Sequence, residues 1–250
     1  MKRATKLEAL RTTFGAQAVS PGERRIAVTG LFDRIAPRYD LMNDLMSFGT
    51  HRLWKHAMIA RAVAHLDSNP GPVLDLAGGT GDIAFGLRKR LPEREIVVVD
   101  ASSGMLDVAR TRSGASLGYV HAPAEALPFP DGSAAMVTLS FGLRNMTDPA
   151  AALTEVVRVL RPGGKLVLLE FSKPQPWFAP LYGLHARYVI PRLGALVAGD
   201  RGAYRYLVES IERFPGRDDV AREIARAGLD IVEERAFVFG VARMQIAVKP

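Results

Sequence analysis

Residues 75–82 read DLAGGTGD, and this stretch decides the fold of the chain. It continues an apolar run that begins at Val73, and residues 82–91 after it have the apolar spacing of a helix. Glycines at such a junction let a ligand approach the backbone closely, because they carry no Cβ atom. The amino end of the following helix offers free N–H groups to that ligand. The stretch therefore predicts a strand, a binding turn and a helix.

The same alternation of strand and helix continues along most of the chain. Short apolar runs predict strands at residues 73–76, 96–99, 118–121, 136–141, 165–171, 229–239 and 242–248. Apolar residues at helical spacing predict helices at 82–91, 104–112, 150–160 and 218–227. Apolar strands that alternate with helices predict an α/β fold of the Rossmann-like type, with a mostly parallel seven-stranded sheet covered on both faces.

The length and composition fit one domain with one core. The chain has 250 residues, of which 48% are hydrophobic and 24% are charged, close to the globular average. Residues 1–28 show no sustained period and contain the breakers Gly15, Pro21 and Gly22, so we expect a flexible basic arm there and a single domain at 29–250. Within that domain, residues 29–68 predict an N-terminal helical segment, and the aromatic-rich residues 172–217 predict a helical cap insertion. The absence of cysteine excludes a disulfide scaffold and thiolate chemistry.

The net charge of +7 is concentrated in two segments. Residues 1–28 carry six basic and two acidic side chains, and residues 173–217 carry seven basic and three acidic ones. Such segments favour nucleic acid, an anionic membrane surface or an acidic substrate as a partner. No apolar run approaches the roughly 18 residues of a spanning helix. We expect a soluble cytoplasmic protein, and a peripheral position at the inner face of the membrane stays open.

Acidic residues around the turn indicate the kind of cofactor. Asp100 ends the second strand, 19 residues after Gly81, where a carboxylate can accept hydrogen bonds from both hydroxyls of a ribose. Asp75 and Asp82 flank the turn and would repel the pyrophosphate of a dinucleotide. S-Adenosylmethionine has no phosphate and carries a sulfonium and an ammonium group. We therefore expect S-adenosylmethionine, held by Asp75, Gly79 and Asp100.

Two further stretches follow the expected strands at the same edge of the sheet. AEALPFPD at 124–131 is a turn suited to cover an adenine ring. Ser140, Arg144 and Asn145 lie at the carboxyl end of the fourth strand, where open parallel sheets bind their ligands. A surface loop tied by its own hydrogen bonds is the alternative for this stretch. Glu170 ends the fifth strand, where it either serves the site or forms a structural ion pair.

Several stretches together resemble one known family. They are residues 32–40 with Asn43, SFGTHRLWK at 47–55, DLAGGTGD at 75–82, SFGLRNMTD at 140–148, LEFSKP at 169–174 and AYRYLVESIERFP at 203–215. In these stretches the chain, over residues 25–249, resembles the ubiquinone/menaquinone biosynthesis C-methyltransferase family. The resemblance implies a class I S-adenosylmethionine-dependent methyltransferase fold. It also implies methylation of a ring carbon of a prenylated quinol.

The family pattern assigns cofactor contacts to particular residues of this chain. It implies Thr80 in the glycine loop, Asp100 on the ribose, Ala124 beside the adenine and Ser140 at the base of the pocket. The family usually has Asp or Asn before Ala124, able to bond the adenine amino group. Here Pro123 stands at that position and cannot make this bond. Adenine recognition must then use backbone groups or packing.

The reaction implied by the resemblance converts demethylmenaquinol to menaquinol, and methylation of a benzoquinol on the ubiquinone route is the alternative. The quinol hydroxyl must lose or share its proton so that the ring carbon becomes electron-rich. We expect Arg144 and Asn145 as catalytic residues that stabilise the developing oxyanion, and Glu170 or a bound water as the proton acceptor. Substrate contacts are expected from Tyr39, Asn43, His51, Tyr204 and Tyr206. His51 packed on its own helix, and the cap aromatics packed as core, are the alternatives.

The expected partners are a prenylated quinol and an anionic membrane surface, because the cap mixes aromatic with basic residues. An RNA methyltransferase would also explain the positive charge, but the sequence shows no appended recognition module, so nucleic acid is not expected. A noncatalytic scaffold that binds quinone or cofactor is a third reading. The five histidines lack the spacing of a metal site, so no metal is expected. Whether the chain forms a homodimer is left open.

Overall fold

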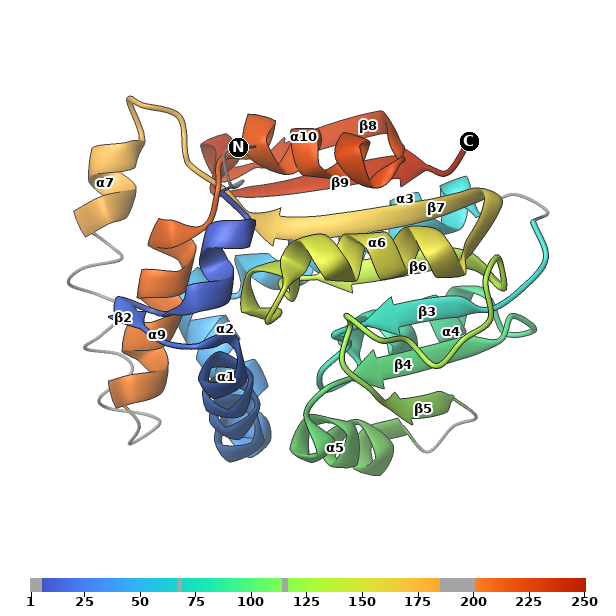
Figure 1. The fold of residues 1–250 in the computed structure, drawn as a ribbon, viewed down its shortest axis with the longest axis horizontal. Coiled ribbons are helices and arrows are strands. Elements are labelled where there is room, and N and C mark those ends of the chain that lie inside the picture. The colour runs from blue at the N-terminus through green and yellow to red at the C-terminus, as the bar shows by residue number, and fades with distance from the viewer. Residues whose placement is uncertain (1–5, 67–68, 114–116, 185–200) are drawn as a thin grey trace.

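The computed structural model describes residues 6–66, 69–113, 117–184 and 201–250. In this part of the chain seven strands form one sheet in the order β5-β4-β3-β6-β7-β9-β8 (Figure 1). Their bounds are β3 Val73–Leu76, β4 Ile96–Asp100, β5 Gly118–His121, β6 Ala134–Ser140, β7 Leu160–Phe171, β8 Asp230–Phe237 and β9 Ala242–Val248. The first five of these strands pair in parallel, and β9 pairs antiparallel with both β7 and β8. The predicted mostly parallel sheet is confirmed.

The strand order reverses beside β3. From β3 the chain runs through α4 (Asp82–Arg90) to β4 and through α5 (Ser103–Ser113) to β5 on one side. It then returns to β6 and β7 on the other side of β3. Such a reversal leaves a crevice outside the carboxyl ends of the central strands, since the connections there lead in opposite directions. The topology alone therefore locates a ligand site at the ends of β3, β4 and β6.

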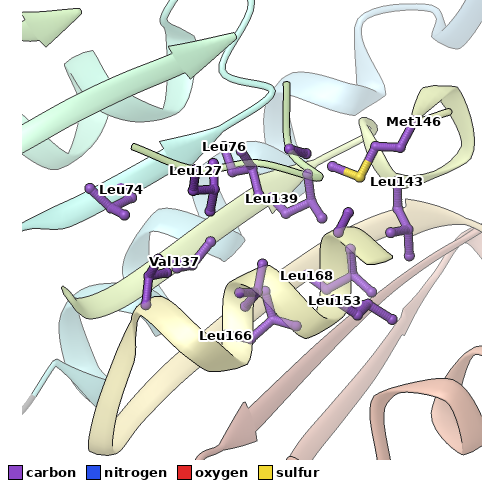
Figure 2. Packing of buried hydrophobic residues seen from close by; sticks show 14 of the residues in the cluster. Leu74, Leu76, Leu127, Val137, Leu139, Leu143, Met146, Leu153, Leu166 and Leu168 are labelled. Carbon is purple, nitrogen blue, oxygen red and sulfur yellow. The ribbon is translucent and has the colours of Figure 1, made fainter. Parts of the chain in front are cut away.

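The two faces of the sheet pack into separate apolar clusters. Alternate strand residues point to opposite faces, so Leu74 and Leu76 belong to one cluster and Val73 belongs to the other. Figure 2 shows the first face, where leucines of β3, β6 and β7 meet Leu153. That face is covered by α6 (Pro149–Val159) and α10 (Arg217–Ala227), and the other by α3 (Thr50–His65) and α4.

The N-terminal part differs from the expected loose arm. Leu7 is fully buried in the first cluster, and β1 (Thr13–Phe14) pairs with β2 (Gln17–Ala18). The helix α1 then runs over Pro21–Ile35, with Ser20 as its N-cap in a capping box with Glu23. Pro21 and Gly22 were expected to break the chain, but proline is favoured in the first turn of a helix that follows such a cap. For residues 6–28 the prediction of a flexible arm is wrong.

The expected N-terminal helical segment, residues 29–68, contains α2 (Tyr39–Ser47), α3 and part of α1. The first of these helices, α1, begins at residue 21, earlier than expected. The predicted cap contains α7 (Ala179–Leu184) and α9 (Arg201–Arg213), while residues 185–200, including His185, lie outside the described residues. The buried face of α9 packs against α1, and both lie beyond the carboxyl ends of the strands (Figure 1). Among the described helices none is long and apolar enough to span a membrane.

Candidate functional site

A large cavity lies at the carboxyl ends of β3, β4 and β6, as the topology requires. Its volume is about 780 Å³ when the open mouth is included. Its lining comes from the turn after β3, the segments that follow β4, β5 and β6, and the helices α1 and α2. It includes Val28, Phe32, Tyr39, Ala77, Gly79, Asp100, Ser102, Pro123, Ala124, Ser140, Phe141 and Asn145. Helices α1 and α2 therefore form one wall of a cavity whose other walls come from the end of the sheet.

A second, smaller cavity of about 340 Å³ lies on the other side of the glycine turn. It is lined by Lys55, Asp75, Thr80 and Asp82, and it shares Tyr39, Ala77, Gly79, Ser140 and Phe141 with the large cavity. The two cavities are thus the two ends of one cleft that bends around the turn. A ligand with a nucleoside at one end and a charged group at the other fits this shape.

The backbone of the turn is strained where it faces the cleft. Ala77 and Phe141 have positive φ angles of 50° and 56°, which residues with a Cβ adopt rarely. Gly79 also has a positive φ, and a Cβ on Gly78 would lie 2.7 Å from the side chain of Val98. Strain of this kind persists where the surrounding structure imposes it, and it concentrates at binding sites.

Asp100 holds the turn from the neighbouring strand. Its Oδ2 accepts a hydrogen bond from the Gly79 backbone N at 2.8 Å, and its Oδ1 accepts one from the Ser102 N at 2.8 Å. Burial raises the pKa of Asp100, and the two backbone bonds oppose this rise. Asp100 lines the large cavity, and each of its oxygens can accept a further hydrogen bond. The two backbone donors therefore fix this carboxylate at the place where the ribose contacts are expected.

Asp75 lies behind the turn, at the charged end of the cleft. Its Oδ1 accepts a hydrogen bond from the Thr138 hydroxyl at 2.8 Å, and its Oδ2 accepts one from the Ala84 N at 3.1 Å. Burial raises the pKa of Asp75 to about 7, more than these hydrogen bonds lower it. A cationic ligand beside it would favour the ionised form.

The charge of Asp82 is balanced by two cations. This corrects the expectation from the sequence that Asp82 would repel a pyrophosphate. Lys55 Nζ bonds Asp82 Oδ2 at 2.9 Å, and Arg112 Nη2 bonds its Oδ1 at 2.9 Å. Burial alone would raise the pKa of Asp82, but these two cations together lower it. Arg112 also bonds Asp40, whose other oxygen accepts the Thr80 hydroxyl. Two acids and two bases thus form a chain across the outer end of the cleft.

Small side chains lie where the adenine and sulfonium parts of the cofactor are expected. Pro123 and Ala124 line the large cavity, so packing is available for a ring at that place. Ser140 lines both cavities, and its hydroxyl is buried and has no hydrogen-bond partner among the described residues. A buried hydroxyl without a partner at a residue that lines a cavity is a candidate ligand contact. Together with Asp100 and Asp75, these groups fit S-adenosylmethionine.

Asn145 and Arg144, neighbours in the chain, face different surroundings. Asn145 lines the large cavity, accepts the Tyr206 hydroxyl at 3.1 Å and donates to the Phe141 carbonyl at 3.2 Å. Arg144 is 4% exposed and lies outside the described lining of both cavities. Its Nη1 donates to Glu170 Oε1 at 2.7 Å and to the Phe141 carbonyl at 2.6 Å. Arg144 and Glu170 form a buried pair beneath the loop that presents Asn145.

The expected substrate residues are not all at the cleft. Tyr39 lines both cavities, and Tyr206 lies behind Asn145, stacked on Phe14 at 4.4 Å. Tyr204 is buried against α1 and lines a separate cavity with Arg34, Arg38 and Met42. His51 is buried and shares a hydrogen bond with Ser47, and Asn43 lies on α2 outside the described lining of both cavities. Burial lowers the pKa of His51 to about 4.

Two residues that the sequence did not single out hold the N-terminal helices over the site. Arg24 is 2% exposed and donates from Nη2 to the carbonyls of Arg144 at 2.9 Å and Met146 at 3.1 Å. Asp33 accepts the Ser102 hydroxyl at 2.5 Å and the Gly104 N at 3.1 Å. The partners are 69 or more residues away in sequence, so no local pattern could reveal these bonds.

Comparison with known proteins gives a consistent result. The model of the ubiE/COQ5 methyltransferase family matches residues 19–249. The chain is similar to "Ubiquinone/menaquinone biosynthesis C-methyltransferase UbiE" of Dinoroseobacter shibae, with 46% identity over 93% of this chain and 94% of that protein. It is similar to the protein of the same name from Rubrivivax gelatinosus, with 43% identity over 96% of this chain and 94% of that protein.

Solved structures share the fold at low sequence identity. A SAM-dependent methyltransferase of Thermotoga maritima has a TM-score of 0.61 at 17% identity, over 89% of this chain and 100% of that one. Magnesium protoporphyrin IX methyltransferase of Synechocystis, crystallised with bound SAH, has a TM-score of 0.56 at 16% identity, over 80% of this chain and 84% of that one. These likenesses confirm the predicted class I methyltransferase fold.

The contact between Asp100 and the ribose can be tested by cofactor affinity. We expect Asp100→Ala to weaken S-adenosylmethionine binding about ten- to a hundredfold, because a charge-assisted hydrogen bond is lost and Gly79 is released. Calorimetry measures this directly. Asp107→Ala removes an exposed carboxylate of α5 and should leave the affinity unchanged. Equal affinities of the Asp100→Ala variant and the wild type would refute the assignment.

The raised pKa of Asp75 predicts a pH dependence of cofactor binding. The cationic cofactor favours the carboxylate, so affinity should rise as the pH increases through about 7 and the carboxyl ionises. Between about pH 7.5 and about pH 6 the affinity should fall roughly tenfold. Asp75→Asn should bind more weakly and lose this dependence. Titrations at several pH values that give parallel curves for both proteins would contradict the role of Asp75.

Proposed function

Because this chain belongs to the ubiE/COQ5 methyltransferase family, we propose that it methylates a ring carbon of demethylmenaquinol to give menaquinol, with S-adenosylmethionine as the methyl donor. The names of the similar proteins cover both the ubiquinone and the menaquinone route. A benzoquinol substrate is therefore the second candidate. The observation that carries the proposal is the bent cleft, with Asp100 at its nucleoside end and Asn145 on the wall that continues past Ser140.

In the proposed reaction, the protein binds a hydroxyl oxygen of the quinol while that hydroxyl loses its proton. When bound, S-adenosylmethionine supplies an electrophilic methyl group. Asn145 lines the cavity, and its side-chain amide can donate one further hydrogen bond besides that to Phe141. In the proposal this amide holds the hydroxyl oxygen and stabilises the charge that develops there. Tyr206 acts through Asn145, because its hydroxyl fixes the orientation of the amide.

Arg144 and Glu170 enter the proposal as positioning residues. Glu170 accepts hydrogen bonds from Arg144 Nη1, from the Arg144 N at 3.3 Å and from the Phe171 N at 2.8 Å. A carboxylate with three such bonds has few lone pairs left for a proton. Bound water is therefore the favoured proton acceptor. The pair also neutralises two buried charges and supports the turn at Phe141.

Tyr39 is proposed to contact the substrate where the two cavities meet. Its ring packs edge-on against Phe32 at 6.0 Å, and Phe32 and Val28 also line the large cavity. This apolar wall suits the flat ring of a quinol. His51, Asn43 and Tyr204 would act on the substrate only through other residues, since they lie outside the described lining of the cleft.

The quinones of cells that lack the protein test the proposed substrate. Deletion of the gene should cause demethylmenaquinone to accumulate, as measured by mass spectrometry, and its restoration should return menaquinone. The Asp100→Ala variant serves as a control that should not restore it. Accumulation of an unmethylated benzoquinone with normal menaquinone would overturn the naphthoquinol assignment in favour of the second candidate. An unchanged quinone profile would reject both.

The proposed role of Asn145 separates catalysis from binding. Asn145→Ala should lower the single-turnover rate by about two orders of magnitude, the usual scale for one donor to a developing oxyanion. The dissociation constant of S-adenosylmethionine should barely change. Tyr206→Phe keeps the ring stacked on Phe14 but removes the bond to Asn145, so a smaller loss is expected. Weak cofactor binding with normal turnover at saturation would show that Asn145 is part of the cofactor wall instead.

A further inference from the structure

An aromatic cluster lies on the surface where the chain leaves the sheet. Trp177 and Phe178 precede α7, and Phe239 lies in the turn between β8 and β9. The ring of Phe239 is 4.7 Å from that of Trp177 and 5.0 Å from that of Phe178. Trp177 is 63% exposed and Phe239 is 51% exposed. We call these three rings, with the exposed side chains beside them in sequence, the aromatic patch: Trp177, Phe178, Leu181, Leu184, Val238 and Phe239.

Hydrogen bonds join the two segments that form the patch. The Gln175 N donates to the Phe239 carbonyl at 2.8 Å, and the Trp177 indole donates to Gln175 Oε1 at 2.7 Å. Val238 and Phe239 have positive φ angles of 43° and 52°, which bulky residues avoid. Apolar side chains that the structure exposes in a strained turn indicate a surface with a function.

The charged residues within the two segments that build the patch are all basic. The two segments that build it, residues 171–184 and 235–243, contain Lys173, Arg235 and Arg243 but no Asp or Glu. The Arg243 guanidinium lies beside the turn, 3.5 Å from the place that a Cβ on Gly240 would occupy. From neighbouring elements, Glu212 acts electrostatically on Lys173 and Tyr182, and Glu234 acts on Arg243. Exposed aromatic side chains with only basic residues in their own segments suit an anionic lipid surface.

The patch also lies close to the proposed site. Phe141, which lines the cleft, contacts Phe171 at 4.7 Å, and Phe171 contacts Trp54 at 6.3 Å. Phe178 packs against the apolar cluster that contains these rings. Figure 1 shows α7 at the outer edge of the molecule, beyond the carboxyl end of β7. A bilayer held at the patch would therefore lie next to the end of the sheet where the cleft opens.

We propose that the aromatic patch docks this protein on an anionic bilayer, with Trp177, Leu181 and Phe239 entering the lipid interface. The reason for docking rests on the proposed function, because a prenylated quinol resides in lipid and must reach the cleft from there. The docking itself depends only on the apolar area and the charge of the patch.

The two tryptophans of the chain allow a direct test. Trp54 is 5% exposed in the core, so in a Trp54→Phe background Trp177 reports on the patch alone. Vesicles of equimolar phosphatidylglycerol and phosphatidylcholine should shift its emission to the blue and shield it from a water-soluble quencher. Pure phosphatidylcholine should do so less. Phe239→Ser and Leu181→Ser should each weaken binding to the mixed vesicles, measured by sedimentation, by about tenfold.

Val232→Ser is the matched control, because Val232 is also exposed, at 52%, but lies on β8 outside the patch. It should bind vesicles as the wild type does. A Trp177 signal that ignores vesicles, or equal losses for Val232→Ser and Phe239→Ser, would overturn the proposal. Patch variants that dissociate an oligomer without changing vesicle binding would also overturn it and identify a protein contact. Vesicle binding without methylation of any quinol would instead reject the proposed function and leave the docking intact.

Discussion

The hydrogen bond from the Gly79 backbone to the carboxylate of Asp100 fixes the geometry on which the site depends. It joins the turn after β3 to the end of β4, and the same carboxylate also accepts the Ser102 N at the start of the next helix. Neither strand could align the turn by itself, because its glycine and Ala77 have positive φ angles that cost free energy. A half-buried acid with two backbone donors offsets that cost, and it lines the cleft.

A second constraint comes from the N-terminal helices, which complete the cleft from outside the sheet. Asp33 of α1 binds the start of α5, and Arg24 of the same helix binds the backbone of the loop that carries Asn145. Burial lowers the pKa of Arg24, and the carbonyls of Arg144 and Met146 take the place of water around it. One helix therefore holds both the start of α5 and the loop that carries Asn145.

The sequence predicted what depends on local patterns and missed what depends on distant contacts. The strands around residues 75–82 and the positions of Asp100, Ser140 and Asn145 follow from alternation and from the rule that ligands bind at carboxyl ends. The start of α1 was readable in Ser20 and Pro21 as a cap, but Pro21 was interpreted as a breaker. A structural ion pair was one of the two readings of Glu170, but its partner Arg144 was not readable, because only the paired β6 and β7 bring the two residues together.

From the sequence, Asp75 and Asp82 were both expected to repel a pyrophosphate, but the charges at the outer end of the cleft show that only one of them does so. Asp40 and Asp82 are matched by Arg112 and Lys55, so this chain of four adds no net charge. The unmatched acid is Asp75, which is buried and has a pKa raised to about 7. Ionised, it gives this end of the cleft a single negative charge, and S-adenosylmethionine, with two cationic groups and one carboxylate, carries a single positive one. A pyrophosphate would add negative charge beside Asp75, which forms no ion pair in the described structure. The preference for S-adenosylmethionine over a dinucleotide, which the sequence attributed to two acids, therefore follows from Asp75 alone.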